Sequence, residues 1–178
     1  VDFTAKLDVR GLVWGRDYYY RFSALGRSSM VGRARCAPKD GEAKALRFAV
    51  TSCASLAHGH FHVYRRIAER EDLDAVLHLG DYLYEYGTGE HGTVREYEPA
   101  HEIVTLADYR MRHAQYRRDP DLQALHQQHA LIPIWDDHES ANDSYEDGAE
   151  NHQPDTAGSW SARKPMWPTA SSAHPSTA

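Results

Sequence analysis

The residues with the clearest chemical potential form the run Asp136-Asp137-His138-Glu139, which directly follows the apolar segment 131–135. Carboxylates and an imidazole at the end of a strand suit a metal ligand beside a group that hydrogen-bonds a phosphoryl oxygen or protonates a leaving alkoxide. The neighbouring Glu139 is expected to orient the ring of His138. The alternative is a solvated acidic loop without a chemical role, but such a loop is not expected directly after an apolar strand.

A second group of candidate ligands follows two other predicted strands. Asp81 lies at the end of one strand, in the run GDYLY at 80–84, and Cys53 lies at the end of the other. The Asp81 carboxylate can bridge two cations, and Tyr84 can fold back over it and bind a ferric ion as a phenolate. A metal lowers the pKa of a thiol, so Cys53 can bind as a thiolate. Each residue alone fits a structural role, as a capping aspartate, a packed tyrosine or a buried cysteine, but together they favour a metal site.

Hydrophobic periodicity predicts the elements that bring these groups together. The predicted strands are the apolar runs at 46–51, 73–79 and 131–135, and the first of them suits a strand buried on both faces. The predicted helices lie around 61–70, over 106–116, and from the acidic cap at Asp119-Pro120 onward. Strands joined by such crossovers run parallel, so their carboxyl ends meet at one edge of a sheet. We therefore expect the polar clusters to converge on one rim.

Residues 1–40 differ in character from the rest of the chain. Short alternating stretches at 3–9, 18–24 and 30–36 are separated by glycine-containing turns, which is typical of the end of a β-sandwich. Segment 37–45 is expected to link this part to an α/β unit over residues 41–164. Residues 165–178 are rich in Pro, Ser, Thr and Ala without apolar periodicity, and we interpret them as a non-native tail produced by a frameshift near Lys164.

Composition excludes several classes of protein. The chain has 178 residues, a net charge of −6 and 41% hydrophobic residues, which fits a folded protein and offers no basic surface to a nucleic-acid partner. Its apolar runs are far shorter than the roughly 18 residues needed to span a bilayer, so a membrane span is excluded. Cys36 and Cys53 are too few for a disulfide framework, and we do not expect them to pair across the linker.

Several segments together resemble the PhoD-like alkaline phosphatases of the metallophosphatase superfamily. They are FAVTSC at 48–53, LDAVLHLGDYLYEY at 73–86, TLADYR at 105–110, RDPDLQALH at 118–126 and WDDHE at 135–139. Residues 1–40, with YYYRF at 18–22, resemble the end of the β-sandwich domain that precedes the phosphatase domain in this family. The resemblance implies an α/β fold, namely the first half of a four-layer α/β/β/α sandwich, preceded by the end of an immunoglobulin-like or fibronectin-like β-sandwich.

The resemblance also implies the composition of the site. Cys53 and Tyr84 would bind a ferric ion (Fe3+), and Asp81 would bridge it to a calcium ion (Ca2+). Asp137, at a position where related metallophosphatases carry asparagine, would be a further ligand, with Asp136 as the less favoured choice. In such a site a metal-bound hydroxide attacks phosphorus in line while the cations neutralise the developing charge.

The activity implied is hydrolysis of phosphate monoesters and diesters, in which His138 would hold the phosphoryl group or assist the leaving oxygen. We expect a phosphoester substrate, a periplasmic or extracellular location and a monomer. Members of this family are much longer and complete the site from a second half, so we expect this chain alone to be inactive and to leave a large apolar face uncovered. The alternatives are a phosphodiesterase or phospholipase D-type enzyme on the same scaffold, and a non-catalytic β-sandwich binding module that needs no metal.

Overall fold

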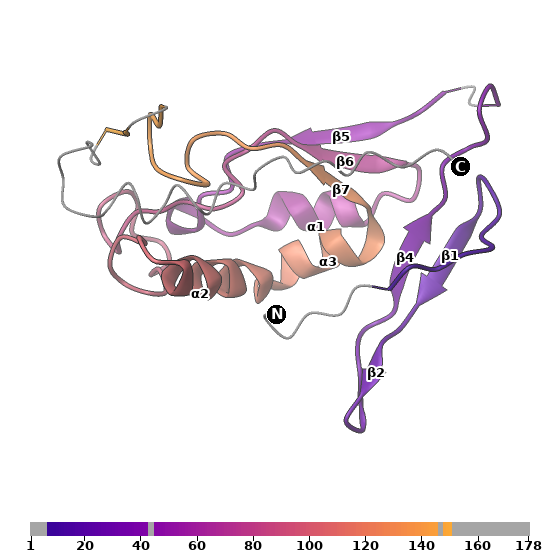
Figure 1. Cartoon of the computed structure of the whole chain (residues 1–178), viewed down its shortest axis with the longest axis horizontal. Helices are drawn as coiled ribbons and strands as arrows, with labels where there is room; N and C mark the ends of the chain where they lie inside the picture. Colours follow the sequence, from indigo (N-terminus) through magenta and orange to yellow (C-terminus); the bar gives the residue numbers. More distant parts are fainter. Residues whose placement is uncertain (1–6, 43–44, 146–147, 151–178) are drawn as a thin grey trace.

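The N-terminal part of the chain consists of short antiparallel strand pairs, seen at one end of the computed structural model in Figure 1. The structure describes residues 7–42, 45–145 and 148–150. In this part β1 (Asp17–Tyr20) pairs with β4 (Gly32–Arg35), and β2 (Ser23–Ala24) pairs with β3 (Arg27–Ser28).

Some of the N-terminal strands differ from the sequence-based expectation. The predicted strand 18–24 is divided between β1 and β2, and Arg21 and Phe22 between them are not in a strand. Residues 7–9 of the predicted strand 3–9 are not in a strand, and its other residues lie outside the described part of the chain. The β-sandwich itself and the boundary near residue 40 stay predictions, as does the frameshifted tail, which also lies outside the described residues.

The larger part of the chain is a parallel α/β unit, as the sequence predicts. Its three strands, in the spatial order β5-β6-β7, are β5 (Phe48–Thr51), β6 (Ala75–His78) and β7 (Leu131–Pro133). Both pairs are parallel. The connections contain a 3-10 turn, η1 (Leu56–His58), and the helices α1 (His62–Ala68), α2 (Leu106–Arg117) and α3 (Pro120–Gln128). No helix among the described residues has the length and apolar character to cross a membrane.

Local sequence explains where α2 and α3 begin. Thr105 caps α2: its hydroxyl accepts the backbone N–H of Asp108, and the Asp108 carboxylate accepts the backbone N–H of Thr105. Asp119 caps α3 by accepting the backbone N–H groups of Asp121 and Leu122, with Pro120 at the first helical position. Both helix starts are therefore encoded within four residues.

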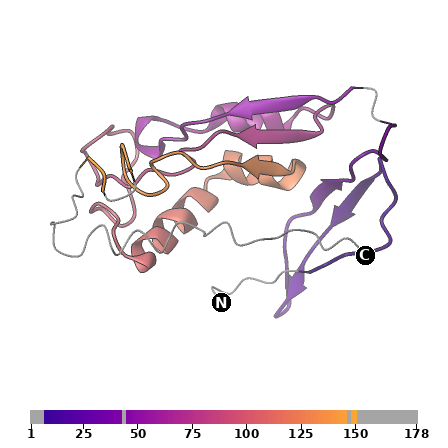
Figure 2. The same cartoon turned by 45° about the horizontal axis from the view of Figure 1, so that its top comes forward.

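The hydrophobic core lies between the helices and one face of the sheet. Its fully buried side chains include Val76 of β6, Tyr116 of α2, and Leu122 and Leu125 of α3. Figures 1 and 2 show α1 and α3 along the same face of the sheet, with α2 continuing beside α3. The described residues of the α/β unit thus form one helical layer on one three-stranded sheet, and the four-layer arrangement stays a prediction.

The opposite face of the sheet is apolar and exposed, and this corrects one expectation. β5 is not buried on both faces: Phe48 is 44% exposed and Val50 is 59% exposed. Ile132 and Ile134, on and after β7, are exposed on the same scale. The sequence of β5 is apolar, as predicted, but within the described residues helices cover only the other face of the sheet.

A fully buried arginine holds the long connection between β6 and α2 in place. The Arg112 guanidinium on α2 donates to the backbone carbonyls of Tyr84, Glu98, Pro99 and His101. It also lies over the ring of Tyr97, 4.0 Å from the centroid. Burial lowers the pKa of Arg112, but a guanidinium remains protonated at any physiological pH. One side chain thereby ties the loop that contains Tyr84 to the helical layer.

We expect Arg112→Met to lower the free energy of unfolding by about 2–3 kcal/mol, because several carbonyl groups lose their donor. Arg112→Lys should recover little of this, since a compact ammonium cannot reach four carbonyls at once. Urea unfolding followed by circular dichroism measures the change. The matched control is Arg118→Met, which removes an exposed ion pair with Glu98 and should cost about 0.5 kcal/mol or less. Equal losses in the two methionine variants would contradict the role given to Arg112.

Candidate active site

The predicted site residues follow the carboxyl ends of three adjacent parallel strands. Cys53 comes after β5, Asp81 after β6, and the run Asp136-Asp137-His138 after β7. In open α/β sheets this is the edge where ligands bind. The parallel topology therefore brings together groups that are far apart in the sequence.

The turns after β5 and β6 are joined directly to each other. The backbone N–H of Cys53 donates to the carbonyl of Gly80 at 3.1 Å, and the N–H of Ala54 donates to the carbonyl of Asp81 at 2.8 Å. Cys53 and Asp81 both have left-handed backbone conformations, with φ of 57° and 54°. For residues with a Cβ this conformation costs roughly 1–2 kcal/mol each. Such strain is typical of functional sites, where the surrounding contacts hold it in place.

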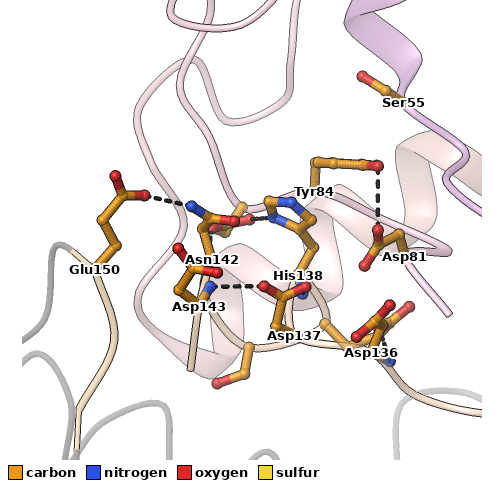
Figure 3. Close-up of polar contacts among 12 residues, drawn as sticks. Ser55, Asp81, Tyr84, Asp136, Asp137, His138, Asn142, Asp143 and Glu150 are labelled. Carbon is orange, nitrogen blue, oxygen red and sulfur yellow. Dashed lines mark hydrogen bonds and ion pairs between the residues drawn. The ribbon is translucent and has the colours of Figure 1, made fainter. Parts of the chain in front are cut away.

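The Asp81 carboxylate is the centre of the first group of candidate ligands. Its Oδ2 atom accepts hydrogen bonds from the Cys53 thiol and the Tyr84 hydroxyl, each at 3.3 Å. Figure 3 shows Tyr84 reaching over Asp81 as the sequence spacing predicts. Cys53 is exposed rather than buried, and it is a free thiol, as is Cys36. The thiol is therefore accessible at the rim and does not belong to the core.

The two oxygens of the Asp81 carboxylate differ in their hydrogen bonding. Its Oδ1 atom is buried and has no hydrogen-bond partner among the described residues. Burial and the charge of Asp81 raise the pKa of Tyr84 well above its usual value of 10.0, so a nearby cation is required to ionise the phenol. A buried oxygen without a donor, beside a thiol and a phenol, fits the donor set of a bound cation.

The second group of candidate ligands lies beside the first. Single donor atoms of Asp81, Asp137 and His138 lie within 4.8 Å of one another, so these three residues could hold a metal ion. Asp137 also folds its own loop, because Oδ1 accepts the N–H of His138 at 2.9 Å and Oδ2 accepts the N–H of Asp143 at 2.6 Å. Asp136 is exposed and is not in this group of three. The geometry therefore favours Asp137 over Asp136 as the candidate metal ligand.

The orientation of His138 corrects a second expectation. Its Nδ1 atom is bonded to Glu85, at 2.8 Å from Oε2, and not to the neighbouring Glu139. The Glu139 carboxylate instead accepts the backbone N–H groups of Tyr82 and Asp136, which fixes the loop. Burial lowers the pKa of His138, but the hydrogen bond and charge of Glu85, together with the charges of Asp81 and Asp137, outweigh it and raise this pKa above 6.5. Burial also raises the pKa of Glu139.

Glu85 was missed by the sequence-based reasoning, although the sequence contains a signal for it. It is a single charged residue between Tyr84 and Tyr86, and it is only 1% exposed. Buried carboxylates require a partner, so a glutamate in an aromatic run indicates a buried polar contact. The identity of the partner depends on the fold, because His138 lies 53 positions further along the chain.

Fold and site together define an α/β protein with an acidic, histidine-containing site at the carboxyl edge of a parallel sheet. The family model for PhoD-like phosphatases matches residues 48–170, and the model for the N-terminal domain of PhoD-like phosphatases matches residues 1–38. The first match alone covers more than half of the chain. The chain therefore belongs to the PhoD-like phosphatase family, as its sequence motifs predict.

Two individual comparisons agree with this family. The chain is 43% identical over 144 residues to alkaline phosphatase D of Bacillus subtilis (strain 168), an alignment that covers 78% of this chain and 24% of that protein. It is also similar to a solved structure of PhoD, with a TM-score of 0.69 and 41% identity, over 75% of this chain and 26% of that one. The chain spans about a quarter of the length of these relatives.

Gly80 permits the close approach of two loops at the site, and we expect Gly80→Ala to disrupt it. Gly80 has φ of +105°, and a Cβ atom there would lie 2.5 Å from the backbone nitrogen and the Cβ of Asp136. The matched control is Gly89→Ala, which has φ of +84° with open space around its Cβ position. The control should lose about 1 kcal/mol of stability from its backbone conformation, and Gly80→Ala should lose about 1–3 kcal/mol more. Urea unfolding compares the two, and equal losses would show that the loops do not need this contact.

Proposed function

We propose that this chain forms the first part of a metal-dependent site that hydrolyses phosphate monoesters and diesters. The observation that carries the proposal is the convergence of the Cys53 thiol and the Tyr84 phenol on one oxygen of Asp81, whose other oxygen is buried without a partner among the described residues. A carboxylate in this setting is poorly stabilised by the protein alone and gains most from a cation.

The donor types support two different cations. A thiolate from Cys53 and a phenolate from Tyr84 suit Fe3+, and a bridging Asp81 with Asp137 suits the oxygen preference of Ca2+. Asp136 remains the less favoured alternative to Asp137, because it is exposed. When bound, such cations supply positive charge that stabilises the negative charge on a phosphoryl group.

The protein's own contribution to the reaction centres on His138. Because an ionised carboxylate only accepts hydrogen bonds, the contact with Glu85 places a proton on Nδ1 of His138. The Nε2 atom then faces away from Glu85, where it can contact a phosphoryl oxygen or exchange a proton with the leaving oxygen. The buried contacts of the ring keep this orientation before substrate binds.

The chain by itself is proposed to be inactive. It spans about a quarter of the relatives' length and leaves one face of its sheet exposed, which supports the view that further ligands and a second layer come from elsewhere. A periplasmic or extracellular location is proposed together with the family function.

The function is tested with a full-length hybrid, in which residues 1–164 of this chain replace the corresponding part of the Bacillus subtilis relative. We expect the hybrid to hydrolyse p-nitrophenyl phosphate and its bis-ester and to lose activity when a chelator removes metal. Asp81→Asn should lower the rate by at least about 100-fold, because loss of a bridging ligand exceeds the 10–100-fold effect of an outer partner.

The assay also separates the alternatives. A folded hybrid that hydrolyses neither ester would favour a non-catalytic binding module, and hydrolysis that survives metal removal would contradict a metal-dependent site. Hydrolysis of the bis-ester alone would favour a phosphodiesterase. Circular dichroism establishes that the hybrid is folded before any of these conclusions is drawn.

Iron binding by Tyr84 has an optical signature. A phenolate bound to Fe3+ gives a visible charge-transfer band, so the iron-loaded hybrid should be coloured, and Tyr84→Phe should abolish the band. Tyr86→Phe is the matched control, because the two rings are stacked with centroids 6.3 Å apart but only Tyr84 bonds Asp81. If the band is lost in Tyr86→Phe but retained in Tyr84→Phe, the iron ligand is Tyr86 and the role proposed for Tyr84 is wrong.

A further inference from the structure

The ring of His138 is held by contacts that come from outside its own loop. Tyr84 lies against it, with ring centroids 4.2 Å apart, and Tyr86 packs edge-on at 5.3 Å. The Glu85 carboxylate, from the same segment, bonds Nδ1 at 2.8 Å. Three consecutive residues after β6 therefore enclose an imidazole that follows β7.

Glu85 itself is fixed more firmly than a surface carboxylate could be. It is 1% exposed, and its second oxygen accepts the backbone N–H of Asn142 at 2.6 Å. Its own carbonyl accepts the N–H of Ile103 at 2.9 Å, and the carbonyl of Tyr84 just before it accepts from Arg112. Both the backbone and the side chain of Glu85 are thus held in place, so its carboxylate acts as a rigid acceptor.

We propose that Glu85 is the positioning residue of His138. The Glu85 carboxylate keeps the ring proton on Nδ1 and leaves Nε2 as the nitrogen that can contact substrate. This inference rests on the proposed function for the use of His138, but its geometry is independent of any metal. The hydrogen bond made by one ring nitrogen decides the tautomer, and hence which atom is available for contact with substrate. Glu139, although adjacent in sequence, accepts the backbone N–H groups of Tyr82 and Asp136, and the His138 ring is bonded to Glu85 instead.

The tautomer of His138 can be measured directly by 15N NMR on this chain in alkaline buffer, where a neutral ring shows which nitrogen carries the proton. We expect the protonated-type signal on Nδ1 and the unprotonated type on Nε2. Glu85→Gln keeps only one acceptor oxygen, which the backbone N–H of Asn142 requires, so its amide NH2 should face Nδ1 and move the ring proton to Nε2. Glu85→Ala should shift both signals toward the average of two exchanging tautomers. Glu139→Gln is the comparison that should leave the pattern unchanged.

A second variant keeps the test decisive if Glu85→Ala does not fold. Glu85→Asp shortens the side chain by one methylene, so it keeps the charge but withdraws the acceptor from Nδ1, and it should show the same shift. In the full-length hybrid, Glu85→Asp and Glu85→Gln should each lower kcat by about 10-fold or more with little change in KM.

The outcomes separate this inference from the proposed function. An unchanged Nδ1–H tautomer in Glu85→Ala, or in Glu85→Asp where the alanine variant is unfolded, would overturn the role of Glu85. A shift caused by Glu139→Gln instead would also overturn it. Absence of phosphoester hydrolysis by the parent hybrid would count against the function and would leave the NMR result for Glu85 as it stands.

Discussion

The site depends on two backbone hydrogen bonds that join the turn after β5 to the turn after β6. They hold Cys53 and Asp81 in left-handed conformations that neither residue would adopt alone, and they place a thiol next to a carboxylate. Without the parallel pairing of β5 and β6 the donors and acceptors of these bonds would not meet. The cost of the two strained turns is therefore offset by the sheet, and its chemical result is the Asp81 cluster.

Buried polar groups connect this cluster to the helical layer. Arg112 on α2 holds the carbonyl of Tyr84, and Glu85 next to it holds both His138 and the loop that follows. A buried polar network is stabilising only when its members are satisfied, so these contacts fix one arrangement of the loops. Oδ1 of Asp81 is one of the buried atoms that have no hydrogen-bond partner among the described residues, and it lies where a cation is proposed to bind.

The open face of the sheet and the proposed incompleteness of the site agree with each other. The chain spans about a quarter of the length of its relatives, and among the described residues helices cover one face of the sheet β5-β6-β7. The exposure of apolar side chains such as Val50 and Ile132 to water is unfavourable, and we propose that a larger domain buries them. Stability and ligand number are therefore expected to improve together in a longer protein.

The sequence by itself determined the parallel α/β unit, the helix cap at Asp119, and the rim on which Cys53, Asp81 and Asp137 meet, because periodicity, capping and the order of strands and helices are read along the chain. Only the tertiary structure decided that Glu85 and not Glu139 orients His138, because the choice depends on which loops cross in space. It likewise decided that β5 has an exposed face, since burial is a property of what packs against a strand and not of its composition.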